Sequence, residues 1–383
     1  MSCEVHQVQL QQAEARALAA EAALAEIRNS TSWRVTAPLR FIRRMAGRLP
    51  GISDPRAAVA PTAVAPTVAA PFPAPPAPVA DPAPAIARVV ASPPFLPTDT
   101  QASIDEFTRI SAASRIDRPF AFGAGVCREH HFRMPLYAYW CRAIGEAAKL
   151  HRKQWEFVFI CQVLHERGML RAGRRGLGFG VGREPLTALF ANLGAGVMAT
   201  DLAPERATEL GWAQSNQHGE SLADLNQRGL CDDALFRSLV DFRFVDMNRI
   251  PGDLAGFDFC WSACALEHLG SLAAGLDFVR NSLNALRPGG LAVHTTEFNL
   301  SSNDATLEHE TLSIYRRRDI EDLIRSLEAE GHRVEPVDFQ AGGDPLDQHV
   351  DLPPFVEVPH LRLELAGYAA TSIGLIIEKA GGR

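Results

Sequence analysis

Short apolar runs and helical patterns alternate along the chain from about residue 175 onward. The apolar runs that predict strands are 175–179, 196–200, 242–246, 257–262, 290–296, 333–339 and 371–379. Helical patterns lie between them at 184–193, 204–216, 222–239, 271–287 and 317–330. Such alternation predicts an α/β fold with a parallel sheet that helices cover on both faces. No clear helical pattern separates the last two runs, so we expect the final pair of strands to be antiparallel.

Ahead of this region the composition changes three times. Residues 1–30 predict a helix rich in alanine and glutamate, and residues 31–50 form a basic amphipathic segment. Residues 51–100 hold half of the chain's 26 prolines and almost no charge, so we expect a disordered linker rather than a core. The folded domain is then 101–383, beginning with helices across 101–172. Their patterns lie near 103–117, 135–152 and 154–170.

The first helix carries a short apolar seam with residues three and four positions apart: Leu10, Ala13, Ala17, Ala20, Leu24 and Ile27. This spacing is typical of a coiled coil. The seam is shorter than the three to four heptads that secure the assignment. Both a single solvated helix and a homodimer therefore stay open.

Charge and cysteine content limit the functional class. A net charge of −7 argues against a dedicated nucleic-acid binder. The seven cysteines contain no CxxC pair, which fits reduced thiols in the cytoplasm. No apolar run approaches the roughly 18 residues of a membrane span. Arg28 to Arg48, however, contains six arginines and no acid, which suits an anionic membrane surface or an acidic partner protein.

The stretch GLGFGVGREP places glycines at alternate positions directly after a predicted strand. Glycines at the first strand-to-helix turn of a doubly wound sheet let a ligand approach main-chain amides. A dinucleotide fold requires G-x-G-x-x-G, but the sixth position counted from Gly178 is Arg183. The pattern is instead Gly178, Gly180 and Gly182, with Pro185 in the first helical turn. A nicotinamide oxidoreductase is therefore disfavoured.

Two aspartates follow the next two predicted strands. Asp201 lies about twenty residues after the glycines, where a carboxylate can accept hydrogen bonds from ribose hydroxyls. Asp246 stands where a carboxylate could accept from an adenine amine, and the Met247 amide would face the ring. Each aspartate alone could equally cap a helix or shape a turn. Their order together with the glycines favours a nucleoside site.

At these residues the chain resembles the class I S-adenosylmethionine (SAM)-dependent methyltransferases. GLGFGVG, ATDL, VDMNRIP, FDFCWSACALEHLG and LRPGGLAVHTTEF are similar to successive motifs of that family. The resemblance implies a Rossmann-like, doubly wound seven-stranded sheet of order 3-2-1-4-5-7-6 whose last strand is antiparallel. It also implies that the glycines line the methionyl part of SAM, Asp201 its ribose, and Asp246 with Met247 its adenine.

One position departs from the family pattern. The family usually has an acidic residue two positions before the first glycine of the turn, and here that residue is Gly176. Because this acid usually steadies the amino end of the cofactor, we expect Ser262 to take over the task, or the affinity for SAM to be lower.

Methyl transfer to a hydroxyl needs alignment and a proton acceptor. The segment LEHLG offers Glu267 and His268 after the fourth strand of the motif set, and histidine is the default base near neutral pH. His268 could instead only pack against the cofactor or cap a helix. His294 and Glu297, at the exit of the fifth strand, are expected to face the same cleft as the next candidates.

The acceptor is expected to meet residues ahead of the sheet. His130, His131 and Arg133 in CREHHFR are predicted to contact it, with Glu297. The long segment 341–362 is expected to form a lid or substrate wall. No metal is predicted, because the candidate ligands do not show the spacing of a metal site. Those candidates are Glu129, His130, His131, Asp347, His349, Asp351 and His360.

The segment STSWRVTAPLR resembles one that recurs in bacterial enzymes that build cell-surface polysaccharides, glycosyltransferases among them. This resemblance implies O-methylation of a sugar in a glycan or its precursor. It also implies contact with the inner membrane or a glycosyltransferase through residues 28–49. Two alternatives stay open: a methyltransferase of a small metabolite or protein, and a non-catalytic scaffold with a relic cofactor fold.

Overall fold

The computed structural model describes residues 102–103, 122–204 and 221–381. The predicted N-terminal helix, basic segment and linker lie outside these residues. So do most of the helix expected at 103–117 and nearly all of the one expected at 204–216.

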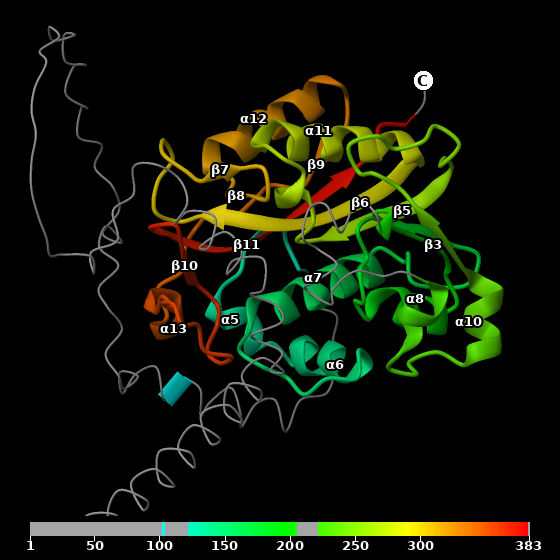
Figure 1. Cartoon of the computed structure of the whole chain (residues 1–383), viewed down its shortest axis with the longest axis horizontal. Coiled ribbons are helices and arrows are strands. Elements are labelled where there is room, and N and C mark those ends of the chain that lie inside the picture. Colours follow the sequence, from blue (N-terminus) through cyan, green and yellow to red (C-terminus); the bar gives the residue numbers. More distant parts are fainter. Residues whose placement is uncertain (1–101, 104–121, 205–220, 382–383) are drawn as a thin grey trace, which may run out of the picture.

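A mostly parallel sheet forms the centre of the described chain (Figure 1). Its parallel part runs in the order β4 (Val240–Phe244), β3 (Gly196–Asp201), β2 (Arg175–Gly178), β5 (Phe257–Ala263) and β6 (Leu286–Asn299). β11 (Tyr368–Glu378) follows β6 and runs antiparallel to it. Three short strands also pair antiparallel with β11: β1 (Gly125–Val126), β9 (Arg333–Val334) and β10 (Leu363–Leu365).

The expected count of seven strands is therefore wrong, because this sheet has nine. β1 and β10 are two and three residues long, too short to show an alternating pattern in the sequence. The predicted strand 333–339 is ladder-paired over only two residues, and the predicted strand 242–246 begins and ends two residues earlier.

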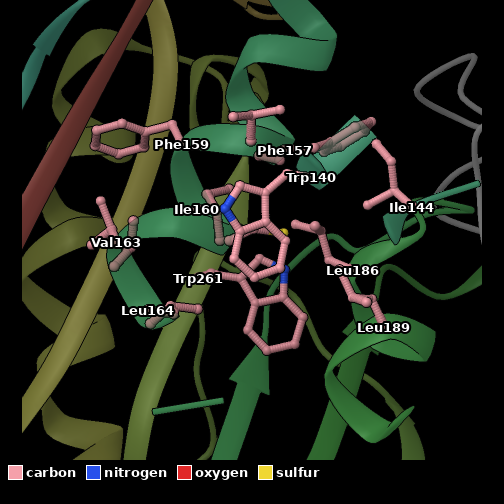
Figure 2. Packing of buried hydrophobic residues seen from close by; sticks show 14 of the residues in the cluster. Trp140, Ile144, Phe157, Phe159, Ile160, Val163, Leu164, Leu186, Leu189 and Trp261 are labelled. Carbon is pink, nitrogen blue, oxygen red and sulfur yellow. The ribbon is translucent and has the colours of Figure 1, made fainter. Parts of the chain in front are cut away.

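Helices cover both faces of the sheet (Figure 1). One layer contains α6 (Pro135–Ala143), α7 (Arg152–Glu166), α8 (Leu186–Asn192) and α10 (Asp233–Leu239). The other contains α11 (Leu272–Ser282) and α12 (Arg317–Ala329). Figure 2 shows Trp140 and Ile160 of the first layer packed against Trp261 of β5, and all three are fully buried. Each layer has its own apolar core against the sheet.

Two predicted helices are shorter than expected, each for a local reason. The helix expected at 135–152 ends at Ala143, because Gly145 takes a φ of 73° that a continuing helix cannot accommodate. The helix expected at 222–239 divides at Gly229, where φ is 63°. Its first part is a 3₁₀ turn, η2 (Leu222–Asn226), and its second part is α10.

Several short elements had no sequence signal: α5 (Glu129–Phe132), η3 (Leu266–His268), β7 (Glu308–His309), β8 (Leu312–Ser313) and α13 (Pro345–Gln348). The helix expected at 271–287 ends as α11 at Ser282 and continues as a 3₁₀ turn, η4 (Leu283–Ala285). Within the described ranges, the helices are all too short or too polar to cross a bilayer.

Candidate functional site

The glycine turn, residues 178–182, directly follows β2. Gly180 and Gly182 have φ values of 57° and 53°, a region that side chains with a Cβ rarely occupy. A Cβ at Gly178 would lie 2.5 Å from both Cζ2 of Trp261 and Cγ1 of Val181. Backbone conformation and close packing thus explain the three glycines at alternate positions.

Asp201 ends β3 and closes onto this turn. Its carboxylate is buried and accepts the amide N–H of Gly182 at 3.0 Å and that of Leu202 at 2.8 Å. The two hydrogen bonds fix the orientation of the carboxylate at the glycine turn. The carboxylate is therefore attached to the glycine turn, as the spacing of the two motifs suggested.

The loop after β4 meets the same turn. The amide of Val245 donates to the carbonyl of Asp201 at 2.7 Å. A Cβ at Gly180 would lie 3.2 Å from Sδ of Met247 and 3.1 Å from Cβ of Ala265, so loops from three strands converge there. Asp246 is half-buried and accepts the amide of Asn248 at 2.9 Å, which shapes this loop next to Met247.

These residues fit a nucleoside such as that of SAM. The positive φ values of Gly180 and Gly182 allow a tight main-chain turn at the end of β2. Asp201 supplies acceptors for hydroxyl groups, and Met247 supplies an apolar flank. The residues match a nucleoside in shape and in the kind of hydrogen bond that they offer. All of them lie at the carboxyl ends of neighbouring parallel strands.

Charged side chains from the start of α7 lie over the ends of β5 and β6. Arg152 pairs with Glu297 and donates to Ser372 Oγ at 3.0 Å. Lys153 donates to the carbonyl of Ala263 at 2.9 Å and lies 3.3 Å from Glu156. Glu156 is fully buried and also accepts from Ser372 Oγ at 2.6 Å. We call these residues, with Glu267 and Glu297, the α7 charge network. Sequence reasoning missed its helical members, because their partners are more than 100 positions away.

Glu184, the first acid after the glycine turn, was also missed. It accepts the indole N–H of Trp261 at 2.6 Å. Burial raises the pKa of its carboxyl group to about 8, although Trp261 and Lys153 both act to lower it. The position of Glu184 two residues after Gly182 is the feature of the sequence that could have indicated a place in the site.

Glu267 and Glu297 lie close together within the network. One oxygen of each carboxyl group and Sγ of Cys264 all lie within 4.8 Å of one another. Both glutamates are buried, and burial raises the pKa of each to about 7. Lys153 acts to lower the pKa of Glu267, and Arg152 that of Glu297, but burial has the larger effect.

His268 lies beside this pair on η3, with about a fifth of its side chain exposed. Its Nδ1 is 2.6 Å from the carbonyl oxygen of Thr311, so Nδ1 carries the proton and donates it. Nε2, the basic nitrogen, lies 3.9 Å from Oε1 of Glu267. Burial lowers the pKa of His268 to about 4, so the ring is neutral near pH 7.

His294 and Ser262 do not face the cleft, which corrects two expectations. Nδ1 of His294 is 2.8 Å from Ser262 Oγ, and Nε2 is 3.2 Å from Ser282 Oγ on α11. All three residues are fully buried. Residues three apart on a strand point to opposite faces, so His294 packs toward α11 while Glu297 points toward α7. Ser262 is thereby occupied by His294 and does not take the place of the acid missing at Gly176.

Because burial lowers the pKa of His294 to about 3, we expect this residue to make stability pH-dependent. The unfolded chain binds a proton near pH 6.5 and the folded chain does not. The stabilising contribution is therefore present above about pH 6.5 and is lost as the pH falls. The difference in unfolding free energy between wild type and His294→Gln should shrink by about 2 kcal/mol from about pH 7 to about pH 5. Urea unfolding at both pH values measures this, and a constant difference would contradict it.

Only some of the residues that were predicted to contact the methyl acceptor lie beside a common cavity. His130 lines a cavity of about 470 Å³ with Arg128, Asp347 and the loop 340–344. His131 is not part of this lining, although its ring centroid lies 4.2 Å from that of His130. Its Nδ1 accepts the amide of Arg128 and the indole N–H of Trp155, which fixes the ring. A contact between His131 and the substrate stays a prediction. Arg133 forms an ion pair with Glu129 on its own helix.

The segment 341–362 lies against the start of α7. The amide of His360 donates to the carbonyl of Leu150 at 2.8 Å, and the amide of Arg152 donates to the carbonyl of His360 at 3.0 Å. Nδ1 of His360 is 2.6 Å from Oδ2 of buried Asp351, which holds the ring in place. The segment thus packs beside the α7 charge network, and its role as a lid or substrate wall stays a prediction.

Comparison with known proteins gives structural likeness only. No protein-family model and no curated protein matches the chain. Among solved structures, it is similar to a DhpI–SAH complex at 15% identity, over 58% of this chain and 85% of that one, with a TM-score of 0.34. It is similar to an S-adenosylmethionine-dependent methyltransferase from Clostridium acetobutylicum at 14% identity, over 60% and 92% of the two chains, with a TM-score of 0.35.

A third similar structure is magnesium protoporphyrin IX methyltransferase from Synechocystis with bound SAH. The identity is 12%, the coverage 73% of this chain and 96% of that one, and the TM-score 0.36. Similarity this low does not identify a reaction, which must be inferred from the site itself.

Proposed function

We propose that this protein is a SAM-dependent methyltransferase that acts on a hydroxyl group. The observation that carries the proposal is the closure of Asp201 onto the amide of Gly182, with Met247 lying against Gly180. The glycine turn, Asp201 and the loop that carries Met247 are thus brought to one edge of a parallel sheet. Ligands bind at this edge in open α/β sheets.

The charged end of the cofactor would meet residues other than Ser262. Lys153, anchored to the carbonyl of Ala263, supplies a positive charge for a carboxylate. Glu184 supplies an acceptor for an ammonium group, and its raised pKa would fall once such a cation lay beside it. These two residues take the part that the family pattern gives to the acid absent at Gly176.

The bound cofactor supplies a methyl group that its sulfonium charge activates. The protein then has to align the acceptor and accept one proton. His268 is suited to this because its neutral ring presents Nε2 as a proton acceptor, while Thr311 fixes the other nitrogen. Alignment falls to the wall formed by 341–362 and to the cavity beside His130.

For the acceptor we propose a sugar hydroxyl of a cell-surface polysaccharide or its precursor. The polar lining of the cavity, with Arg128, His130 and Asp347, suits a ligand with many hydroxyl groups. The N-terminal segment that resembles those of polysaccharide-building enzymes is the other support.

Two measurements test the proposal. Calorimetry should show that the purified full chain binds SAM, and the polysaccharide of cells that contain the protein should carry methyl groups that cells without it lack, as measured by mass spectrometry. Absence of SAM binding would leave only a scaffold with a relic fold. SAM binding with an unchanged polysaccharide would point instead to a small metabolite or a protein as the acceptor.

A further inference from the structure

The α7 charge network contains one more carboxyl group than cations. Glu156, Glu267 and Glu297 face Arg152 and Lys153; four of these side chains are buried, and Lys153 is partly exposed. An unbalanced charge in a protein interior is costly, so the excess must be relieved by a proton or by a bound cation.

The two carboxyl groups that carry this excess also have unused oxygens. Oε1 of Glu267 and Oε2 of Glu297 are inaccessible to solvent and have no hydrogen-bond partner in the described structure. Their other oxygens are engaged: Oε2 of Glu267 accepts from Thr296 Oγ1 at 3.1 Å, and Oε1 of Glu297 contacts Arg152. A buried carboxylate oxygen without a donor is satisfied most simply by protonation.

A proton fits this place better than a metal ion. Cys264 Sγ could complete a set of three ligands, but the guanidinium group of Arg152 already lies 3.9 Å from that sulfur and contacts Glu297. A divalent cation would have to share the site with this fixed positive charge. The same charge favours a carboxyl pair that keeps only one proton between its members.

The unused oxygen of Glu267 is also the one nearest to His268. Nε2 of His268 and Oε1 of Glu267 are 3.9 Å apart. A proton taken up by His268, whose pKa is about 4, passes downhill to a carboxylate whose pKa is about 7. His268 alone would be a weak base, and the carboxylate behind it makes proton removal favourable.

We propose that Glu267 and Glu297 together hold one proton in the resting protein and release it through His268 to solvent. In the ionised form that results, the pair accepts through His268 the proton that methyl transfer releases. This inference rests on the proposed function. In the step, the acceptor oxygen bonds to the methyl carbon, the bond from that carbon to the sulfonium sulfur breaks, and the hydroxyl proton moves to Nε2 of His268 and on to Glu267. The charged and titratable groups around the pair are Arg152, Lys153 and Glu156 on α7, Cys264 after β5, His268 on η3 and Tyr315 before α12.

The resting state of the pair can be measured without any catalysis. Infrared spectroscopy of the full-length protein should show a protonated carboxyl group that titrates near pH 7, where the pKa values of the pair lie. Glu267→Gln and Glu297→Gln should each abolish this titration, whereas the carboxyl group of Glu184, whose pKa is about 8, should still titrate in both variants. The matched control, Glu321→Gln on the exposed side of α12, should leave it unchanged. No titrating carboxyl group near pH 7 would overturn the inference, and so would a stoichiometric metal ion that Glu297→Gln releases.

The role in catalysis needs a rate measurement as well. Glu267→Gln should lower kcat by about 10²–10⁴-fold and remove the acid limb near pH 7 from the pH–rate profile, with circular dichroism confirming the fold. Glu297→Gln should shift that limb, and Glu321→Gln should leave it in place. An active Glu267→Gln with an unaltered profile would overturn the relay alone. Wild-type protein with no methyl transfer would overturn the proposed function, and the relay role with it.

Discussion

Replacing Arg152 with methionine should lower the free energy of unfolding by about 3–5 kcal/mol, the effect expected when one partner of a buried ion pair is removed. Arg152 is about 7% exposed and contacts Glu297, Glu156 and Ser372. Methionine fills a similar volume but supplies no charge, so Glu297 is left buried beside two other acids. Urea unfolding followed by circular dichroism measures the change.

The pH dependence of this loss distinguishes charge from packing. Protonation removes the uncompensated charge, so the deficit of Arg152→Met should be smaller at about pH 5 than at about pH 8, on either side of the pKa of Glu297. Arg317→Met, which breaks an exposed pair with Glu321, is the matched control and should cost no more than about 1 kcal/mol. A deficit that is equal at both pH values would assign the effect to packing.

Replacing Asp201 with alanine should weaken SAM binding by roughly 100-fold, about 3 kcal/mol, if the proposed function holds. The change removes the acceptors for ribose hydroxyls. It also leaves the amides of Gly182 and Leu202 without the partner that orders the glycine turn. Calorimetric titration with SAM measures the dissociation constant.

Asp277→Ala on the exposed side of α11, where Asp277 pairs with Arg280, controls for loss of a surface carboxylate. It should leave the dissociation constant unchanged. Equal affinity of wild type and Asp201→Ala would show that the carboxylate does not contact the ligand, and the adenosyl site would have to be sought elsewhere.

The sequence predicted the central strands β2, β3 and β5 well, because they lie in largely buried apolar runs bounded by turn residues. It did not predict β1 or α13, since a two-residue strand and a helix of a single turn show no period to detect. The break in the helix expected at 222–239 could have been read from Gly229, which stands between two shorter helical patterns.

For the site, the order of the motifs in the sequence predicted which residues lie together. The sequence did not predict the direction in which the side chains point. Gly180, Asp201 and Met247 could be grouped because the carboxyl ends of parallel strands meet at one edge. The sequence analysis wrongly expected His294 to face the cleft. His294 and Glu297 are three residues apart on one strand, so their side chains point to opposite faces of the sheet. The α7 charge network could not be found from the sequence, since it joins residues such as Arg152 and Glu297 that only the folded sheet brings together.

β11 has a consequence for how the molecule is made. Four other strands, β1, β6, β9 and β10, pair with this one segment, Tyr368–Glu378, and all of them precede it in the chain. During synthesis, the edge of β6 that pairs with β11 therefore stays unpaired and exposed until β11 has left the ribosome. A chain that stops before Tyr368 should therefore be aggregation-prone and be removed by chaperones or proteases, rather than fold into an enzyme of lower activity.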